Sequence, residues 1–214
     1  MTLFGIYGAS GAGRGVMPLA RALASDKSAG LVFIDDSASE PEINGHRVLT
    51  FDAFLAEPGD DKRVVVAIAN SRIRETLVAR CAAAGIGFFL VKAENVVIMD
   101  DVTIGEGAIL SPFVTLTSNI RIGRHFQANL YSYVEHDCVI GDFVTFAPAV
   151  RCNGNIVIED HAYIGTGAVL KQGRPGAPLV IGRGAVVGMG SVVTKSVPPG
   201  VTVAGNPARP LRKD

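Results

Sequence analysis

The sequence contains no tryptophan and only three cysteines, Cys81, Cys138 and Cys152, none of them in a CxxC pair. An odd number of thiols cannot all form disulfides, and without a CxxC spacing neither a zinc ribbon nor a dithiol redox motif is expected. The cysteine usage therefore predicts free thiols in a reducing cytoplasm. Cys152 also falls on a regular series of aliphatic residues, which favours a buried thiol over a reactive one.

An excess of charge and a long apolar run are missing as well. The net charge is zero, and the longest aliphatic run is "VVVAIA". A nucleic-acid partner is not expected, because its binding depends on phosphate neutralisation. A membrane span is not expected either, because it needs about 20 apolar residues. The start, "MTLFGIYGAS", has no charged n-region, so a signal peptide is not expected.

What is present divides the chain into two halves. Up to Glu94, short apolar segments alternate with helical patterns: strands at 3–10, 31–36, 63–69 and 86–91, and helices at 13–25 and 71–85, the second with Ser71 as N-cap and Gly85 as its stop. Strands separated by helices predict right-handed crossovers and a small parallel sheet, an α/β domain.

After Glu94, aliphatic or small residues recur every six positions. The series runs without interruption over thirteen positions: Ile98, Ile104, Leu110, Leu116, Ile122, Ala128, Val134, Ile140, Phe146, Cys152, Ile158, Ile164 and Leu170. After an interruption it resumes at Ile181, Val187 and Val193. A six-residue period is typical of a parallel β-helix, in which each hexapeptide forms one face of a triangular coil. Residues eighteen apart are then expected to stack.

These patterns predict three segments: an α/β domain over 1–94, a β-helix over 95–197 and a capping tail over 198–214. The interruption at 171–180, "KQGRPGAPLV", is rich in Gly and Pro. It predicts a loop of about five extra residues, either beside a binding site or tolerated on the surface.

A glycine-rich turn, "GASGAG", follows the first strand and opens the first helix. Such a turn lets backbone N–H groups at a helix N-terminus approach phosphate, and acids about 20 residues further on commonly hold a ribose. Close helix–strand packing is the alternative explanation. Because the domain is too short for a full dinucleotide fold, we expect one nucleotide rather than NAD. The candidate residues are Gly8, Ser10, Gly11, Gly13, Asp35 and Asp36.

The chain has four histidines, and no pair is five apart as in β-helix zinc enzymes, so a metal site is not expected. His46 is expected in a turn with a structural role. His125 and His161 occupy outward positions of the repeat, where a solvated histidine is expected and a functional one is the less favoured alternative.

His136 differs because Asp137 follows it and Gly154 stands eighteen residues further on, one coil above. An imidazole beside a carboxylate can act as a general base near neutral pH. A stacked glycine leaves space for a thin substrate and exposes a backbone N–H for an oxyanion. A surface histidine on a repetitive scaffold is the alternative.

The hexapeptide run, "VEHDCVIGDF", "IGTGAV", "VVGMGSVVTKSVP" and "VAGNPAR" resemble the hexapeptide-repeat acetyltransferases. With "YGASGAGRGV" and "FIDD" ahead of the repeat, the whole chain is similar to the sialic acid O-acetyltransferase and sugar-nucleotide N-acetyltransferase group, which includes enzymes of the bacillosamine and perosamine pathways. The resemblance implies a left-handed β-helix, a homotrimer with active sites between subunits, acetyl-CoA as co-substrate, and a Rossmann-like domain for the nucleotide of an amino sugar.

The resemblance also implies roles for individual residues. His136 corresponds to the family's catalytic histidine, with Asp137 as its acidic partner. Asn129 takes the place of a sugar-binding asparagine, and Gly154 that of the amide facing the thioester. Further acetyl-CoA contacts are implied for Gln172, Gly188, Gly190 and Thr145, the last standing where several relatives carry a second histidine. Arg209, Arg212 and Lys213 would reach the CoA phosphates, unless the tail is simply solvated.

The predicted function is acetyl-CoA-dependent N-acetylation of a UDP- or GDP-linked 4-amino-dideoxy sugar for surface glycan biosynthesis. Transfer is expected to be direct, with His136 as general base, because no Ser or Cys has a base beside it. The alternatives are O-acetylation of a sialic acid and a non-catalytic trimeric scaffold that senses a nucleotide. A Rossmann-type reductase is disfavoured, because Tyr131 and Tyr133 lack the YxxxK spacing.

Overall fold

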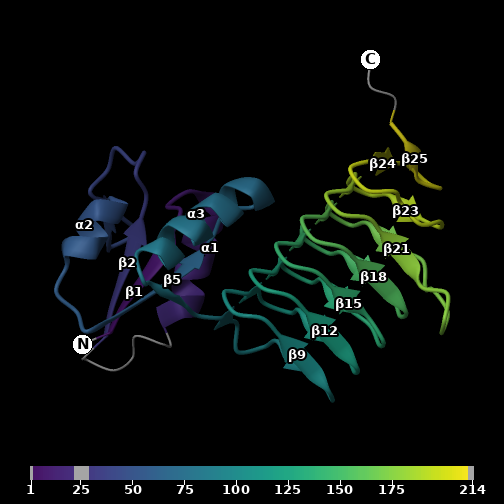
Figure 1. Cartoon of the computed structure of the whole chain (residues 1–214), viewed down its shortest axis with the longest axis horizontal. Coiled ribbons are helices and arrows are strands. Elements are labelled where there is room, and N and C mark those ends of the chain that lie inside the picture. Colours follow the sequence, from purple (N-terminus) through teal and green to yellow (C-terminus); the bar gives the residue numbers. More distant parts are fainter. Residues whose placement is uncertain (1, 22–28, 212–214) are drawn as a thin grey trace. The chain divides into compact units, whose positions relative to one another are not determined.

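The computed structural model describes residues 2–21 and 29–211. The chain forms two compact units, Met1–Lys92 and Ala93–Asp214. The first holds helices and a sheet, and the second is a stack of short strands (Figure 1). The last three residues of the predicted capping tail, including Arg212 and Lys213, lie outside the described residues.

A six-stranded sheet forms the centre of the first unit, in the order β3-β4-β2-β1-β5-β6. Its pairings are parallel except that of β3 with β4, so the predicted parallel sheet is confirmed. The strands of this unit are β1 (Thr2–Tyr7), β2 (Ala29–Ile34), β3 (Glu42–Ile43), β4 (His46–Leu49), β5 (Asp61–Val66), β6 (Gly87–Phe88) and β7 (Val91–Lys92).

Within the part of this unit that the structure describes, three helices accompany the sheet: α1 (Gly11–Ala20), α2 (Phe51–Ala56) and α3 (Ser71–Ala83). The first begins two residues before the predicted helix, whose end at 22–25 falls outside the described residues. Ser71 is not the N-cap of α3. Asn70 takes that place, because its side-chain oxygen accepts hydrogen bonds from Arg72 N at 3.0 Å and Ile73 N at 3.2 Å.

The second unit is a parallel β-helix whose strands stack coil on coil, as Figure 1 shows for β9, β12, β15, β18 and β21. The first sheet holds β9 (Val102–Ile104), β12 (Ile120–Ile122), β15 (Val139–Ile140), β18 (Ile156–Ile158) and β21 (Leu179–Ile181). The second holds β8 (Val97–Ile98), β11 (Thr115–Leu116), β14 (Tyr133–Val134), β17 (Arg151–Cys152), β20 (Val169–Leu170) and β23 (Val192–Val193). Within this unit the third holds β10 (Ile109–Leu110), β13 (Gln127–Ala128), β16 (Thr145–Phe146), β19 (Tyr163–Ile164), β22 (Val186–Val187), β24 (Thr202–Ala204) and, at its C-terminal edge, β25 (Arg209–Pro210).

The strand register confirms the eighteen-residue coil. Thr115 pairs with Tyr133, eighteen residues on, and Tyr133 pairs with Arg151. Across the interruption the offset grows to twenty-three, as in the pairing of Tyr163 with Val186. Five extra residues are therefore accommodated without a break in stacking, and they form a small loop closed by a bridge between Arg174 and Ala177.

The six-residue aliphatic series fills the inside of the coil, where Leu116, Cys152 and Ile164 are fully buried. The first residue of the series is less buried, since Ile98 is 39 % exposed. Burial of these side chains over successive coils supplies the apolar core that the repeat needs.

Between the faces, the chain turns at residues with positive φ, and these corner residues stack into three ridges. The Asp137 ridge consists of Asp101, Asn119, Asp137 and Asn155. The Phe143 ridge consists of Gly107, His125, Phe143 and His161, and the Tyr131 ridge of Phe113, Tyr131, Ala149 and Gly167. Left-handed backbone at ordinary residues is uncommon, with Asn, Asp and His enriched there.

The predicted outward, solvated placement of His125 and His161 is wrong. His125 is 1 % exposed and His161 is 7 % exposed. Both rings stack on Phe143, with centroid distances of 5.1 Å and 5.2 Å. A corner with positive φ places successive rings face to face along the ridge, and that stacking shields them from water.

The C-terminal segment continues the coil and then folds back. The strand β24 pairs with β22 in parallel, and β25 (Arg209–Pro210) pairs with β24 in antiparallel fashion. The outer edge of the last coil is therefore paired with the tail of the chain.

Candidate active site

His136 and Asp137 form a dyad at a corner of the β-helix. The imidazole Nδ1 lies 2.7 Å from Oδ2 of the carboxylate, and the two side chains are 45 % and 49 % exposed. Asp137 has a φ of 59°, which turns its side chain back toward the preceding residue. Because Nδ1 is engaged by the carboxylate, Nε2 is the nitrogen left to accept a proton.

Gly154 lies directly over the imidazole. A Cβ built on Gly154 would be 2.6 Å from both Cε1 and Nε2 of His136, closer than any normal contact. The space that the missing side chain leaves is thus taken by the imidazole ring itself, rather than held open for a substrate. Position 154 must therefore be glycine if the His136 ring is to keep this place.

Backbone hydrogen bonds continue this stack upward. Asn155 N donates to His136 O at 2.9 Å, and Gly173 N donates to Gly154 O at 3.0 Å. Gln172 therefore lies in the next coil above Gly154, at the start of the inserted loop, and is exposed. Within the described chain no acceptor engages the N–H of Gly154, which leaves that donor available for an oxyanion.

The other predicted acetyl-transfer residues belong to a second edge of the coil. Asn129 precedes the corner at Tyr131, and the strand β14 separates it from His136. Gly188 is three coils above Asn129 by strand register, and Gly190, with a φ of 67°, extends the Tyr131 ridge. Within one chain the structure does not bring these residues to the dyad.

Thr145 lies on β16, in the sheet that leads to this second edge, and is 5 % exposed. Its strand partners are Gln127 and Tyr163. The predicted residues thus form two groups, one around His136 and one along the edge that includes Asn129.

The glycine-rich turn lies at the start of α1. Ser10 is the N-cap, but its side chain makes no capping hydrogen bond. Gly11 faces open space, with nothing within 4 Å of a Cβ built there, whereas a Cβ on Gly13 would lie 1.7 Å from Gly8 O. The turn is therefore tightly packed on one side, and the first N–H groups of the helix are open to a ligand on the other.

Asp35 and Asp36 follow β2 and are held by the protein itself. Asp35 accepts hydrogen bonds from Ala9 N at 2.9 Å, Ser37 N at 3.0 Å and Ser37 Oγ at 2.7 Å. Burial raises the pKa of Asp35, but these hydrogen bonds outweigh it and keep the pKa below its usual value.

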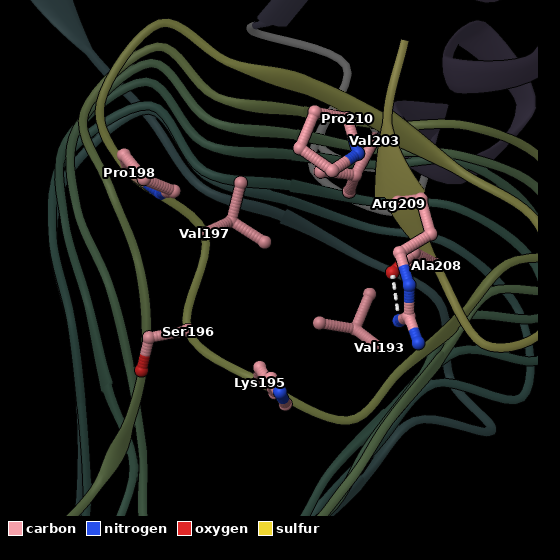
Figure 2. A pocket seen from close by; sticks show the side chains of 9 residues that line it. All are labelled: Val193, Lys195, Ser196, Val197, Pro198, Val203, Ala208, Arg209 and Pro210. Atoms are coloured by element: carbon pink, nitrogen blue, oxygen red, sulfur yellow. Dashed lines mark hydrogen bonds between the residues drawn. The ribbon is translucent and has the colours of Figure 1, made fainter.

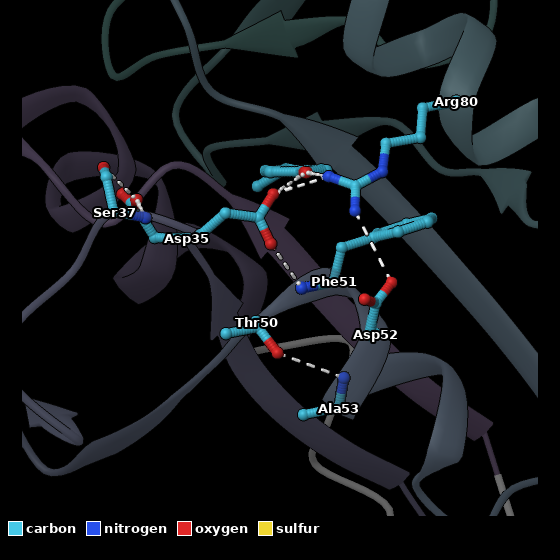
Figure 3. Close-up of polar contacts among 9 residues, drawn as sticks. Asp35, Ser37, Thr50, Phe51, Asp52, Ala53 and Arg80 are labelled. Carbon is cyan, nitrogen blue, oxygen red and sulfur yellow. Dashed lines mark hydrogen bonds and ion pairs between the residues drawn. The ribbon is translucent and has the colours of Figure 1, made fainter.

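Asp36 joins three elements of the first unit. It accepts from Tyr7 Oη at 2.7 Å, Phe51 N at 2.8 Å and Arg80 Nη1 at 2.6 Å. Figure 3 shows Arg80 extending over the Phe51 ring toward Asp52, and its cation lies 4.3 Å from the ring centroid. Burial works against ionisation of Asp36, yet the hydrogen bonds and the Arg80 charge lower its pKa overall.

Tyr7 and Arg80 were not anticipated from the sequence as part of this network. Burial, followed by the hydrogen bond to Asp36, raises the pKa of the Tyr7 hydroxyl. A carboxylate has about four acceptor positions, and protein donors fill three on each of Asp35 and Asp36. Each acid retains room for about one hydroxyl of a ligand.

A pocket of about 220 Å³ opens at the C-terminal end of the β-helix. Val193 and Val197 point into it, and the cations Lys195 and Arg209 also line it (Figure 2). Arg209 Nη1 donates to Ala208 O at 3.0 Å. The predicted residues of the two edges do not belong to this pocket.

Over 2–21 and 29–211, no group of three or more His, Cys, Asp or Glu side chains is arranged to hold a metal ion. Among the same residues, no helix has the length and apolar character needed to cross a membrane.

Comparison with known proteins connects both units to sugar acetylation. Residues 4–81 match the family model of the PglD N-terminal domain. GDP-perosamine N-acetyltransferase of Escherichia coli O157:H7 is 50 % identical over 216 residues, covering 100 % of this chain and 98 % of the relative.

Solved structures give the same result. WeeI from Acinetobacter baumannii AYE shares 57 % identity and a TM-score of 0.96, covering 99 % of this chain and 100 % of the other. The acetyltransferase domain of PglB from Neisseria gonorrhoeae FA1090, in complex with acetyl coenzyme A, shares 29 % identity and a TM-score of 0.87, covering 98 % of each chain. The predicted fold, a Rossmann-like sheet followed by a left-handed β-helix, is confirmed. Because a relative of 50 % identity is matched along its full length, the chain belongs to the sugar N-acetyltransferase group of the hexapeptide-repeat acetyltransferases.

Proposed function

We propose that this chain transfers an acetyl group from acetyl-CoA to the amine of a nucleotide-linked 4-amino-4,6-dideoxy sugar, with GDP-perosamine as the first candidate. The observation that carries the proposal is the His136–Asp137 dyad beneath Gly154, in a chain matched over its whole length by a GDP-perosamine N-acetyltransferase. The product is proposed to serve surface glycan biosynthesis, as the sequence resemblance implies.

In this mechanism His136 Nε2 accepts a proton from the sugar amine as the amine attacks the thioester carbonyl. Asp137 holds Nδ1 protonated and stabilises the imidazolium that forms. The N–H of Gly154 donates to the oxyanion of the tetrahedral intermediate. Collapse of the intermediate breaks the C–S bond and expels the CoA thiolate, which takes the proton back from the His136 imidazolium, so CoA leaves as the thiol and the base is regenerated. No covalent acyl-enzyme is needed, because within the described chain the His136 imidazole bonds Asp137, and the Cys138 thiol reaches only the backbone oxygen of His136 and not its ring.

The active unit is proposed to be a homotrimer with each site between two subunits. The dyad lies at one corner of the coil, whereas Asn129 lies at the preceding corner. A neighbouring subunit packed along the coil would bring its own second edge to the dyad, and a cyclic assembly repeats that contact three times. Acetyl-CoA would then lie in the groove, past Gln172 on one side and past Thr145, Gly188 and Gly190 on the other.

The first unit is proposed to hold the nucleotide, and therefore to act as the sugar-nucleotide-binding domain that the sequence suggested for 1–94. The open N-terminus of α1, with Gly8, Ser10, Gly11 and Gly13, suits a diphosphate. Asp35 and Asp36 retain about one acceptor position each for hydroxyl or base-edge donors. The substrates and the free thiols fit a cytoplasmic enzyme.

The test is thiol release from acetyl-CoA with GDP-, UDP- and dTDP-linked 4-amino-4,6-dideoxy sugars, and with sialic acid as the hydroxyl acceptor. The proposal expects turnover with an amino sugar, GDP-perosamine foremost, and none with sialic acid. Release on sialic acid alone would replace N-acetylation by O-acetylation. If no acceptor causes thiol release and acetyl-CoA gives no thermal stabilisation, the non-catalytic trimeric scaffold is favoured.

A further inference from the structure

Directly below Asp137 in the stack is Asn119, and its amide contacts the dyad. Asn119 Nδ2 donates to Asp137 Oδ1 at 3.4 Å, while Oδ2 of the same carboxylate engages His136 Nδ1 at 2.7 Å. The two oxygens of Asp137 are thus held from two sides, by an amide in the coil below and by the imidazole in its own coil.

We infer that Asn119 is a positioning residue for acetyl transfer, which orients the Asp137 carboxylate and thereby the His136 base. This inference rests on the proposed function of the dyad. A carboxylate that hydrogen-bonds only the imidazole can still rotate about its Cβ–Cγ bond. A second hydrogen bond to the other oxygen restricts that rotation. Because Asp137 is half exposed, water alone would not supply that restriction.

A backbone explanation for Asn119 must be separated from this role. Asn119 has a φ of 58°, a region that favours glycine and asparagine over other residues. If backbone conformation were the only requirement, glycine would serve equally well. The side chain matters only if its amide acts on Asp137.

The charge of the side chain matters too, because the dyad has few charged neighbours. In the coil below, Ser118 and Asn119 are neutral, and in the coil above, Gly154 and Asn155 are neutral. In its own coil the titratable neighbours of the dyad are Glu135 and the thiol of Cys138, whose Sγ contacts His136 O at 3.6 Å.

The cation Arg121, two residues after Asn119, has its own carboxylate partner. Arg121 is paired with Asp101, with an Nη2–Oδ2 distance of 3.0 Å. A neutral donor at 119 therefore leaves Asp137 as the carboxylate that directly contacts His136.

Two variants distinguish these roles. Asn119→Gly keeps the backbone conformation and removes the amide, so kcat should fall about 3- to 10-fold with KM nearly unchanged. Asn119→Asp places a second carboxylate against Asp137 and stabilises the imidazolium, so the acidic limb of the kcat/KM profile should move up by ~0.5–1 pH unit.

The matched controls are Asn44→Gly and Asn44→Asp. Asn44 is exposed, lies in the first unit and has a φ of 51°, so these controls repeat both the backbone requirement and the change in net charge. Neither should change kcat or the pH profile.

A second readout does not require turnover. The imidazole signals of the full chain are followed by NMR against pH, with His136 identified by loss of its signal in His136→Asn. In Asn119→Asp the midpoint of this titration should move to higher pH, and in Asn44→Asp it should stay in place. Coincident titrations of wild type and Asn119→Asp, or wild-type kcat in Asn119→Gly, would overturn the inference. If the midpoint shifts in Asn119→Asp but the wild-type protein acetylates no substrate, the proposed function is overturned and the coupling of Asn119 to the dyad stands.

Discussion

His136 Nδ1 lies 2.7 Å from Oδ2 of Asp137, the next residue in the chain. Neighbouring side chains on a strand point to opposite faces, so this contact requires the turn in the backbone at Asp137, where φ is 59°. The dyad is therefore a product of the corner geometry that the hexapeptide repeat creates. The repeat and the proposed chemistry are not separate features.

Replacement of His136 by Asn should remove the base and keep the corner intact. We expect kcat to fall about 10²- to 10⁴-fold, the usual contribution of general-base catalysis, with little change in melting temperature because the side chain is 45 % exposed. Steady-state kinetics and thermal unfolding measure both. His46→Asn in the first unit is the control, and near-full turnover in His136→Asn would remove the histidine from the mechanism.

Replacement of Asp137 by Asn should leave the imidazole present but poorly oriented. The amide cannot stabilise an imidazolium as the carboxylate does, so we expect kcat to fall by about 10- to 100-fold, less than in His136→Asn. Asparagine also tolerates positive φ, so the fold should persist. The measurement is kcat and KM over pH. Equal activity of Asp137→Asn and the wild type would mean that Asp137 is needed only for the backbone turn.

The sequence predicted the β-helix well because the repeat is a one-dimensional pattern. Each hexad residue from Leu110 onward enters the core, and the offset of five residues at the insertion follows directly from counting. Gly154 was found in the same way, since stacking at eighteen residues is a matter of register. A periodic fold places side chains that sequence spacing alone can identify.

Features that depend on three-dimensional contacts were not accessible in that way. The rings of His125 and His161 are buried by stacking on Phe143, which no hydrophobic period encodes. Arg80 meets Asp36 from 44 residues away, on a helix whose partners the sequence does not specify. The short helix α2, which supplies Phe51 to this network, was absent from the predicted elements because six residues give too weak a pattern.

A methyl group at position 154 should affect activity more than stability. The Cβ of Gly154→Ala would meet the imidazole at 2.6 Å, and the ring is the mobile end of a half-exposed side chain that can rotate away. Displacement of a catalytic group by about 1 Å can cost 10²-fold, so we expect kcat to fall by roughly that factor with a small change in melting temperature. The control is Gly87→Ala, where nothing lies within 4 Å. A large loss of stability with normal kcat in the folded fraction would show that the stack serves packing alone.

Asp36 should make the stability of the chain depend on pH. Its pKa is lowered in the folded state, through hydrogen bonds and the Arg80 charge that outweigh burial, so its contribution is complete above the unfolded value of about 4 and is lost as the pH falls through the folded value. Asp36→Asn removes the ionisable group, so it should melt at a lower temperature than the wild type at pH 6.

Thermal unfolding between about pH 6 and pH 2.5 checks the sign. The gap between wild type and Asp36→Asn should be constant down to about pH 5 and should narrow below about pH 4, as the wild-type carboxylate takes up a proton and becomes neutral like the amide. Asp52→Asn is the control, because that side chain is 89 % exposed and lies 3.5 Å from the same arginine. A gap that stays constant to pH 2.5 would mean that Asp36 acts through its hydrogen-bond geometry and not its charge. The carboxylate would then serve only to connect β2, α2 and α3 through hydrogen bonds. Its charge would give no support to the proposal that Asp36 binds a donor group of the ligand.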